Sequence, residues 1–372
     1  MINYIENHTD SQNSFRNIFA FIIKHGKTTR REIQKQTKYS WSSVSSVVSV
    51  LLNKGQVIET ESIVNGVGRG TSYIIPNGNK YVSLGVDINS SVFSLSVIGI
   101  DGSIKYENKY LFNGDTEKEV LSLLFQVIDQ GIAFIGDKYT LVSIGISCQG
   151  TVDLNHGIFK RFIFTKDMID CPLKKIIEEK YGVFTYLEHD TNCLLEAYRS
   201  TCDNSESSIC VARVVSGIGF AICVNGQPLE EFGPIDFGHM IVQPKDGRLC
   251  TCGRRGCLEA YSSSSGIIRR AGVSDFSIIK ENREKYRDIL DEAGFNLGVA
   301  FANMSHIFEL KDIIITGDVI GNDEKMIQKI IDANEQYCVE NKPNIVYIDD
   351  LSPSFGAAKL SFKEKINNTG TL

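Results

Sequence analysis

The chain has 372 residues, more than a single hydrophobic core usually supports, so we expect two or three domains. Its hydrophobic content of 42% and charged content of 23% are ordinary for globular proteins, and no stretch reaches the roughly 18 uncharged apolar residues of a membrane span. The opening segment, with Glu6, His8 and Asp10, lacks the basic-then-apolar order of a signal peptide. The sequence therefore argues against a membrane protein and predicts a cytoplasmic location.

The net charge of −6 is unevenly distributed along the chain. Residues 1–80 carry ten Lys or Arg against five Asp or Glu, a local charge of +5, which leaves −11 for the remainder. A basic head on an acidic body suits DNA binding, because Lys and Arg release counterions from phosphates. A chance cluster of solvated charges is the alternative, and charge alone leaves both readings open.

Three helices are predicted near the start of the chain. The first begins at Phe15, where apolar residues follow the i, i+3, i+4, i+7 spacing of an amphipathic helix. The second begins after Thr29, whose hydroxyl can cap it while Glu32 completes a capping box. The third begins after Ser40, which is placed as its cap. The expected buried face of this third helix is Val44, Val47, Val48, Leu51 and Leu52.

Two strands, 56–64 and 71–75, follow the third helix and are separated by a glycine-rich turn. This order of elements predicts a winged helix-turn-helix DNA-binding domain over residues 1–80. The outward face of the third helix, which runs to Ser49, is rich in small hydrogen-bonding groups that fit the major groove. The predicted DNA contacts are Arg30, Arg31, Ser40, Trp41, Ser42, Ser43, Ser45, Ser46 and, at the wing tip, Arg69. A three-helix protein-docking module is the alternative.

From about residue 81 strands alternate with helices, which predicts an α/β body over residues 81–372. Residues 82–99 indicate two strands joined by a polar turn at Asp87 to Ser91, and the pattern restarts at 208–224 around a small-residue turn. The restart predicts a duplicated α/β core with a cleft between its halves. Further helices are expected at about 117–136, 171–181, 284–308 and 323–338, and a strand at Ile313–Thr316.

Three cysteines lie within the short segment Cys250-Thr-Cys252-Gly-Arg-Arg-Gly-Cys257. Thiolates at this spacing, with glycines that let the backbone fold sharply, indicate metal ligands, and His239, a short way upstream, is the natural fourth ligand. A site with three cysteines and one histidine predicts structural zinc, with a redox cysteine cluster or coincidence as alternatives. The other cysteines are expected to be small buried hydrophobes: Cys148, Cys171, Cys193, Cys202, Cys210, Cys223 and Cys338.

From about residue 14 the chain resembles the ROK family (repressors, open reading frames and sugar kinases), in particular the branch of xylose-repressor-like regulators. Cys250 to Glu259 matches the family's zinc signature CxCGxxGCxE in full. The segment ending in Asp236-Phe-Gly-His239 resembles G-x-x-E-x-G-H, with Asp in place of Glu. His189-Asp190-Thr-Asn resembles N-D-x-N, whose Asp is the catalytic base in the family's kinases.

The resemblance implies an actin-like ATPase fold, a sugar in the cleft between the halves, and a homodimer or dimer of dimers. It places the sugar contacts at His189, Asp190, Asp236, His239 and Glu259. Carboxylates suit this task because each accepts hydrogen bonds from two hydroxyls. His239 would then both ligate zinc and touch the sugar. Without the motifs, Asp190 and Asp236 would be interpreted as surface loop acids.

Departures from the family pattern argue against kinase activity. A kinase of this family needs a D-x-G-G-T turn so that backbone N–H groups approach the ATP phosphates, and here the turn is Asp87-Ile-Asn-Ser-Ser. The second phosphate turn keeps only Ser216-Gly217-Ile-Gly219, and Asp318 stands where the family has glycine. Asp190 alone cannot supply phosphoryl transfer, so we expect no catalytic residues and no enzyme activity.

The leading hypothesis is a transcriptional regulator, a repressor of carbohydrate-utilisation genes, that binds a double-stranded DNA operator and responds to a sugar-like effector. One alternative is a ROK sugar kinase, acting on a hexose or amino sugar with ATP, that carries an appended DNA-binding head. Another is a constitutive DNA-binding protein with a vestigial cleft.

Overall fold

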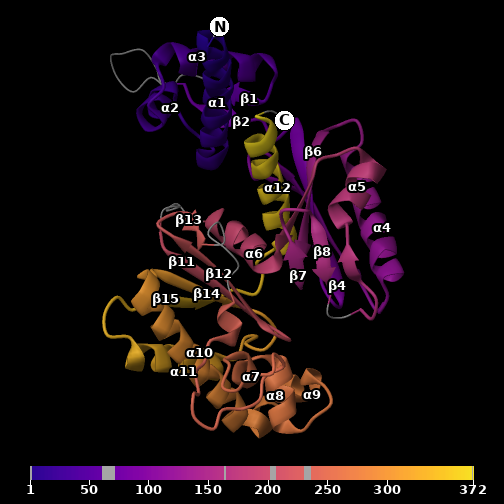
Figure 1. The fold of residues 1–372 in the computed structure, drawn as a ribbon, viewed down its shortest axis with the longest axis vertical. Helices are drawn as coiled ribbons and strands as arrows, with labels where there is room; N and C mark the ends of the chain where they lie inside the picture. Colours follow the sequence, from indigo (N-terminus) through magenta and orange to yellow (C-terminus); the bar gives the residue numbers. More distant parts are fainter. Residues whose placement is uncertain (1, 61–71, 163–164, 202–206, 230–235, 371) are drawn as a thin grey trace. The chain divides into compact units, whose positions relative to one another are not determined.

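The computed structural model describes residues 2–60, 72–162, 165–201, 207–229, 236–370 and 372. The chain divides into two compact units: unit 1 comprises residues 1–196 and 352–372, and unit 2 comprises residues 197–351 (Figure 1). The predicted domain boundary at residue 80 lies inside unit 1 and stays a prediction. Among the described residues, no helix is both long enough and apolar enough to cross a bilayer.

The head of unit 1 consists of three helices and a two-stranded ribbon. Its elements are α1 (Ile2–His25), α2 (Arg30–Thr37), α3 (Trp41–Asn53), β1 (Val57–Glu59) and β2 (Ile74–Pro76). α2 begins with the predicted capping box between Thr29 and Glu32, and the Ser40 hydroxyl caps α3 by accepting from the Ser43 N–H. The winged helix-turn-helix order is confirmed, and among the described residues the ribbon consists of Val57–Glu59 and Ile74–Pro76. Residues 61–71, which include Arg69, lie outside the described part of the chain.

The three helices of the head share one core, which continues into the rest of unit 1. Its fully buried side chains from the helices include Ile18, Phe19, Ile22, Ile33, Val44, Val48 and Leu51. Leu52, also expected to be buried, is only partly so. The same core contains Ile100, Val142, Phe362 and Ile366 from outside the head. Burial of such a side chain stabilises a fold by roughly 1.5–3 kcal/mol, so this shared core favours packing of the head within unit 1.

Unit 1 continues as a five-stranded sheet in the order β10-β6-β3-β4-β5. Its strands are β3 (Tyr81–Ile88), β4 (Val92–Gly99), β5 (Ile104–Leu111), β6 (Thr140–Cys148) and β10 (Thr185–His189). β3 pairs antiparallel with β4 and parallel with β6, and β10 pairs parallel with β6. The turn predicted at Asp87 is wrong by two residues: Asp87 and Ile88 extend β3. Asp87 can be buried there because its carboxylate accepts a hydrogen bond from Ser147.

Helices cover both faces of this sheet. The remaining elements of unit 1 are α4 (Glu117–Ile135), β7 (Thr151–Asp153), β8 (Ile158–Arg161), β9 (Ile169–Cys171), α5 (Leu173–Tyr181), α6 (Asp190–Arg199, which crosses into unit 2) and α12 (Pro353–Thr369). Figure 1 shows α12 on one face and α4 and α5 on the other. α12, which was not predicted from the sequence, packs against glycines of the sheet: a Cβ at Gly145 would lie 2.0 Å from the carbonyl oxygen of Ala357. Close packing of α12 therefore requires glycine at this position.

Unit 2 repeats the strand connectivity of unit 1 in its own five-stranded sheet, ordered β13-β12-β11-β14-β15. Its strands are β11 (Ile209–Val214), β12 (Ile218–Val224), β13 (Gln227–Pro228), β14 (Asp312–Thr316) and β15 (Asn344–Tyr347). Its helices are η2 (Phe237–His239), α7 (Glu259–Ser262), α8 (Ser264–Ala271), α9 (Phe276–Glu281), η3 (Arg283–Tyr286), α10 (Arg287–Phe308) and α11 (Glu324–Tyr337). β11 pairs antiparallel with β12 and parallel with β14, as β3 does with β4 and β6. The predicted duplication of an α/β core is confirmed.

Candidate metal centre, ligand residues and DNA-binding face

Four side chains of unit 2 converge on one point and could hold a metal ion. They are His239, Cys250, Cys252 and Cys257, whose ligand atoms all lie within 4.8 Å of one another. The Cys250 Sγ is 3.6 Å from the His239 Nδ1, and the Cys252 Sγ is 3.7 Å from the Cys257 Sγ. Three sulfurs and one imidazole nitrogen make a complete four-donor set. The structure thus brings together all four residues that were predicted as metal ligands.

A tight hairpin positions the three cysteines. The Cys250 N–H donates to the Arg254 carbonyl, and the Gly256 N–H donates to the Arg248 carbonyl. Gly256 has a φ of +84°, and a Cβ there would lie 2.0 Å from the carbonyl oxygen of Gln243. Only glycine fits that position, so the glycine spacing of the motif is a requirement of the backbone.

The three thiols have different surroundings. Cys250 and Cys257 are buried, whereas Cys252 is exposed. A hydrogen bond from the Arg254 backbone lowers the pKa of Cys252, and burial raises the pKa of Cys257 to about 12. A bound cation would favour the thiolate of both residues, because a coordinated thiol is deprotonated.

The hairpin that carries the three cysteines contacts Glu259, which was predicted to bind sugar. The Thr251 hydroxyl donates to the Glu259 Oε1 over 3.1 Å, and the Ile218 N–H donates to the Oε2 over 3.3 Å. Gly238, between Asp236 and His239, also lies beside this carboxylate, since a Cβ there would be 3.7 Å from the Oε2. The position of Glu259 therefore depends on the conformation of the loop that holds the metal ligands.

In unit 1, His189 ends β10 and Asp190 begins α6. Both side chains are half-buried, and the Asp190 Oδ1 accepts from the Thr191 N–H over 2.9 Å. Asp236, His239 and Glu259, the other predicted sugar contacts, belong to unit 2. That the two groups of residues share one cleft stays a prediction.

Glu188, which was not predicted from the sequence, fixes the turn that carries His189 and Asp190. This buried carboxylate accepts from the Tyr186 hydroxyl over 2.8 Å, from the His189 N–H over 2.8 Å and from the Asn192 side-chain amide over 3.0 Å. Glu188 lies just before the N-terminus of α6, where the helix dipole favours a negative charge. The signal in the sequence was an acid directly before the His189-Asp190 motif.

Two further buried polar residues, also missed, lie in line with Glu188. Asp87, Ser147 and Glu188 are register partners across β3, β6 and β10, three parallel strands whose carboxyl ends meet at one edge. These three side chains make this edge of the sheet in unit 1 polar. Because ligands of open α/β sheets bind at the carboxyl ends of the strands, the edge is a candidate ligand site.

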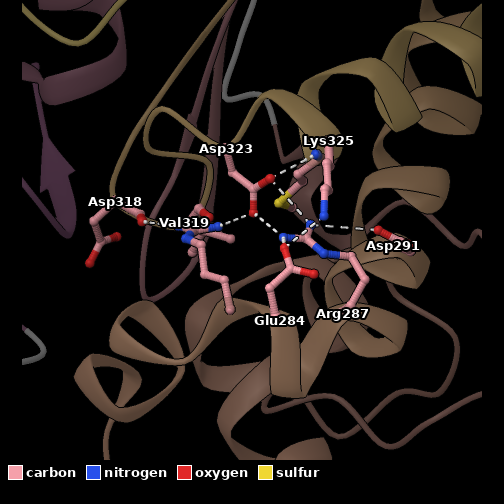
Figure 2. Close-up of polar contacts among 9 residues, drawn as sticks. Glu284, Arg287, Asp291, Asp318, Val319, Asp323 and Lys325 are labelled. Carbon is pink, nitrogen blue, oxygen red and sulfur yellow. Dashed lines mark hydrogen bonds and ion pairs between the residues drawn. The ribbon is translucent and has the colours of Figure 1, made fainter.

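The turn after β14 is fixed by an ion-pair network, shown in Figure 2. Arg283 donates to the carbonyl oxygens of Asp318 and Val319, over 3.3 and 2.9 Å. Arg283 and Arg287 both pair with Asp323, whose side chain is only 4% exposed. The carboxyl of Asp318 points away from Arg287 in Figure 2, and burial raises its pKa. When ionised, this carboxylate would repel a phosphate that approached the turn.

The outward face of α3 is accessible, as a DNA-reading helix requires. Trp41 is 51% exposed, and Ser42, Ser46 and Ser49 are exposed as well. Ser40 and Ser43, two other predicted contacts, have a role within the head: the Ser40 hydroxyl caps α3 by accepting from the Ser43 N–H. Of the remaining predicted contacts in the head, Ser45 is half-buried and Arg31 is exposed.

Arg30, a predicted phosphate contact, is paired with a carboxylate of the ribbon. Its Nη1 is 2.5 Å from the Glu59 Oε1 and its Nη2 is 3.3 Å from the Oε2. This pairing and a hydrogen bond from Ser72 lower the pKa of Glu59. Arg30 thus ties α2 to the ribbon, and a phosphate would have to compete with Glu59 for it.

Comparison with known families settles the relationship of the body. Residues 83–361 match the ROK family, which is more than half of the chain. The chain belongs to the ROK family. The metal-loop cysteines and the residues at the start of α6 all lie within the matched range.

Relatives and solved structures of ROK proteins extend this likeness. The xylose repressor of Bacillus spizizenii is 25% identical over 329 residues, which is 83% of this chain and 83% of that protein. The crystal structure of a ROK family transcriptional regulator, a homologue of the E. coli MLC protein, matches with a TM-score of 0.77 and 18% identity, covering 96% of this chain and 97% of that one. The ROK hexokinase from Thermus thermophilus matches with a TM-score of 0.66 and 21% identity, covering 77% of this chain and 99% of that one. These structures confirm the fold, which ROK regulators and ROK kinases share.

Proposed function

We propose that this ROK protein is a DNA-binding transcriptional regulator, a repressor of carbohydrate-utilisation genes, whose body binds a sugar or sugar derivative without phosphorylating it. The observation that carries the proposal is a capped helix-turn-helix head that shares one core with a ROK α/β half. Phosphoryl transfer to a sugar does not require such a head, whereas DNA binding does. The repressor name of the Bacillus relative supports the same class.

The head would read DNA by placing α3 in the major groove. Exposed serines offer donors and acceptors to base edges, and Trp41 offers an apolar surface to a thymine methyl group. Arg31 would contact phosphate, while Arg30 keeps the ribbon in place through Glu59. A homodimer or dimer of dimers would present paired heads to paired half-sites.

The effector would be bound by hydroxyl-accepting carboxylates from both units. Asp190 is positioned by the turn that Glu188 holds, and Glu259 is positioned by Thr251 and Ile218. Asp236 and His239 complete the set proposed for unit 2. A sugar held between the units would favour one arrangement of them, which is the energetic requirement for a ligand-driven switch.

The absence of phosphoryl transfer is proposed from the residues at the phosphate turns. Asp87 is buried in β3 and bonded to Ser147, and Asn89 and Ser90 place side chains where a kinase needs bare backbone. Asp318 adds a carboxyl at the turn after β14. Phosphoryl transfer depends on positioning and on neutralising charge: the side chains of Asn89 and Ser90 oppose the first, and an ionised Asp318 opposes the second.

Zinc is the ion that the four-ligand cluster fits best. Three thiolates and one imidazole suit zinc in a closed, structural site that leaves no open position for catalysis. When bound, the ion would cross-link the cysteine hairpin to η2 through His239. Cys252→Ser is expected to lower the zinc content and the stability of the body, and full stability after chelation would contradict a structural ion.

Two assays separate the proposal from its alternatives. Gel-shift experiments with genomic fragments at several salt concentrations should show sequence-dependent binding, and its absence at every salt concentration would refute DNA recognition. A coupled ADP-release assay across hexoses, pentoses and amino sugars should show no turnover. Turnover that Asp190→Asn abolishes would instead identify a kinase with an appended head. A thermal-shift screen against sugars separates a sensor from a constitutive DNA-binding protein, because a bound effector must raise the midpoint.

A further inference from the structure

The metal centre is unevenly protected from solvent. Cys257 is fully buried and Cys250 nearly so, but Cys252 is exposed, alone among the cysteines in the described part of the chain. Its Sγ lies 3.7 Å from the Sγ of Cys257. One thiol of the cluster is therefore open to solvent while its neighbour is covered.

We propose that the metal centre is also a site of reversible oxidation, at which a hydroperoxide converts Cys252 and Cys257 into a disulfide and releases the metal ion. The exposed sulfur receives the oxidant and the buried sulfur resolves the product. Exposure of the attacking thiolate, together with a second cysteine in reach, is what oxidation-sensitive cysteines require.

The chemistry balances with hydrogen peroxide as the oxidant. The Cys252 thiolate attacks one peroxide oxygen, the O–O bond breaks, and a sulfenic acid and hydroxide form. The Cys257 thiolate then attacks the Cys252 sulfur and displaces a second hydroxide as the S–S bond forms. Two protons from solvent convert the hydroxides to water, so the sulfur pair loses the two electrons that the peroxide gains.

The sulfurs of Cys252 and Cys257 are already close to each other. The two sulfurs must close from 3.7 Å to about 2 Å. Gly253 and Gly256 lie between the two cysteines with φ of +84° each, and a Cβ at Gly253 would meet no atom within 4 Å. The chain next to Cys252 therefore has space to move, whereas Cys257 stays fixed in the core of the hairpin.

Oxidation would remove two of the four ligands. His239 and Cys250 alone are too few to hold the ion, since structural sites of this kind use four. Thr251 lies between Cys250 and Cys252 and donates to Glu259, so contraction of the loop reaches this carboxylate. Oxidation should therefore also weaken effector binding, a consequence that rests on the proposed function. Release of the metal ion is expected whether or not the chain binds an effector.

The test treats the zinc-loaded full-length chain with hydrogen peroxide. Metal release is followed with a colorimetric chelator, and disulfides are mapped by mass spectrometry of non-reduced peptides. We expect one zinc ion released per chain and a Cys252–Cys257 disulfide, both reversed by a thiol reductant with added zinc. No release at millimolar peroxide, or release without this disulfide, would overturn the proposal.

A matched pair of variants locates the reaction. Cys252→His keeps a zinc ligand but removes the exposed sulfur, and should release zinc about tenfold more slowly. Cys338→Ser changes a buried cysteine outside the cluster and should behave as the unmodified chain. If Cys252→His does not take up zinc, the proposal is judged on the unmodified chain alone: a Cys252–Cys257 disulfide formed with zinc release supports it, and its absence refutes it. A chain that binds no sugar yet forms this disulfide and releases zinc supports the oxidation site while refuting the proposed effector.

Discussion

The two α/β halves have the same strand connectivity but build their sites differently. In unit 1 the strand ends themselves carry the polar groups, with Asp87, Ser147 and Glu188 side by side across three parallel strands. In unit 2 the candidate site lies in the segment between β13 and β14, where a hairpin gathers three cysteines and reaches Glu259. A site made from a sheet edge depends on the core, whereas the loop site of unit 2 would depend on the ion that we propose for it. The two sites should therefore fail under different perturbations.

The largest expected effect is at the proposed metal centre of unit 2. Cys257→Ser removes a fully buried ligand, so we expect metal content to fall to near zero and unit 2 to lose several kcal/mol of stability. Metal analysis and circular dichroism during unfolding measure this, while the fluorescence of Trp41, the single tryptophan, reports the head in unit 1. Cys338→Ser is the control. Equal loss of stability by both variants would show that burial, and not metal binding, is the cause.

The next effect breaks the sheet of unit 1 instead. Gly145→Ala places a Cβ 2.0 Å from the Ala357 carbonyl oxygen, so α12 must shift away from β6. We expect a loss of about 1–3 kcal/mol in chemical denaturation, with metal content unchanged. The control is Gly294→Ala in α10, where the nearest atom would be 3.2 Å away and the change should be within about 1 kcal/mol. A neutral Gly145→Ala would contradict the close packing of α12.

A smaller effect is expected at Glu188, because this residue positions Asp190 without being assigned a sugar contact. Glu188→Gln removes the negative charge: the Gln oxygen can still accept from the His189 N–H and the Asn192 amide, but these bonds are no longer charge-assisted, and the Tyr186 hydroxyl must turn from donor to acceptor. We expect sugar affinity to fall about fivefold, corresponding to about 1 kcal/mol. Calorimetry with the effector measures it, and Glu179→Gln on the exposed face of α5 is the control. Unchanged affinity would show that the turn is held by other contacts.

The smallest effect concerns the ion pair between Arg30 of α2 and Glu59 of the ribbon. Glu59→Gln removes the charge that occupies Arg30, so Arg30 becomes available to phosphate. The slope of log affinity for non-specific DNA against log salt should steepen by about one unit. An unchanged slope would mean that Arg30 does not reach the backbone.

The stabilisation from the Arg30–Glu59 ion pair has a defined pH dependence. The pKa of Glu59 is lowered in the folded head, so its stabilisation is complete above the ordinary value of 4.5 and is lost as the pH falls through the lowered value. Because both side chains are partly exposed, the contribution should be below about 1 kcal/mol. Thermal unfolding of the head between neutral pH and about pH 3, with Glu59→Gln as the reference, measures it.

Features that depend on neighbouring residues were predictable from the sequence. The capping box of Thr29 and Glu32, the Ser40 cap and the metal hairpin all follow from side chains and glycines a few residues apart. The duplicated body was also predictable, because the strand-turn-strand pattern restarts. In each case the pattern and the structure share one local physical cause.

Features that depend on distant partners were not predictable. Arg30 and Glu59 are far apart in sequence, and only the folded ribbon makes them a pair. α12 was missed although Ser352 and Pro353 mark its start and Gly370 its end, because small residues on its buried face hide the usual apolar pattern. Asp87 was placed in a turn because a buried carboxylate needs a partner, and Ser147 comes from another strand.

The most direct test of the account titrates the zinc-loaded chain with operator-sized genomic fragments while following Trp41, which is half exposed at the start of α3. The account predicts a fluorescence change that depends on DNA sequence, persists at physiological salt and is altered when the cognate sugar is added. A fluorescence change that is the same for every DNA fragment and vanishes as the salt concentration rises would contradict the account. ATP-dependent phosphorylation of a sugar by the same chain would contradict it as well.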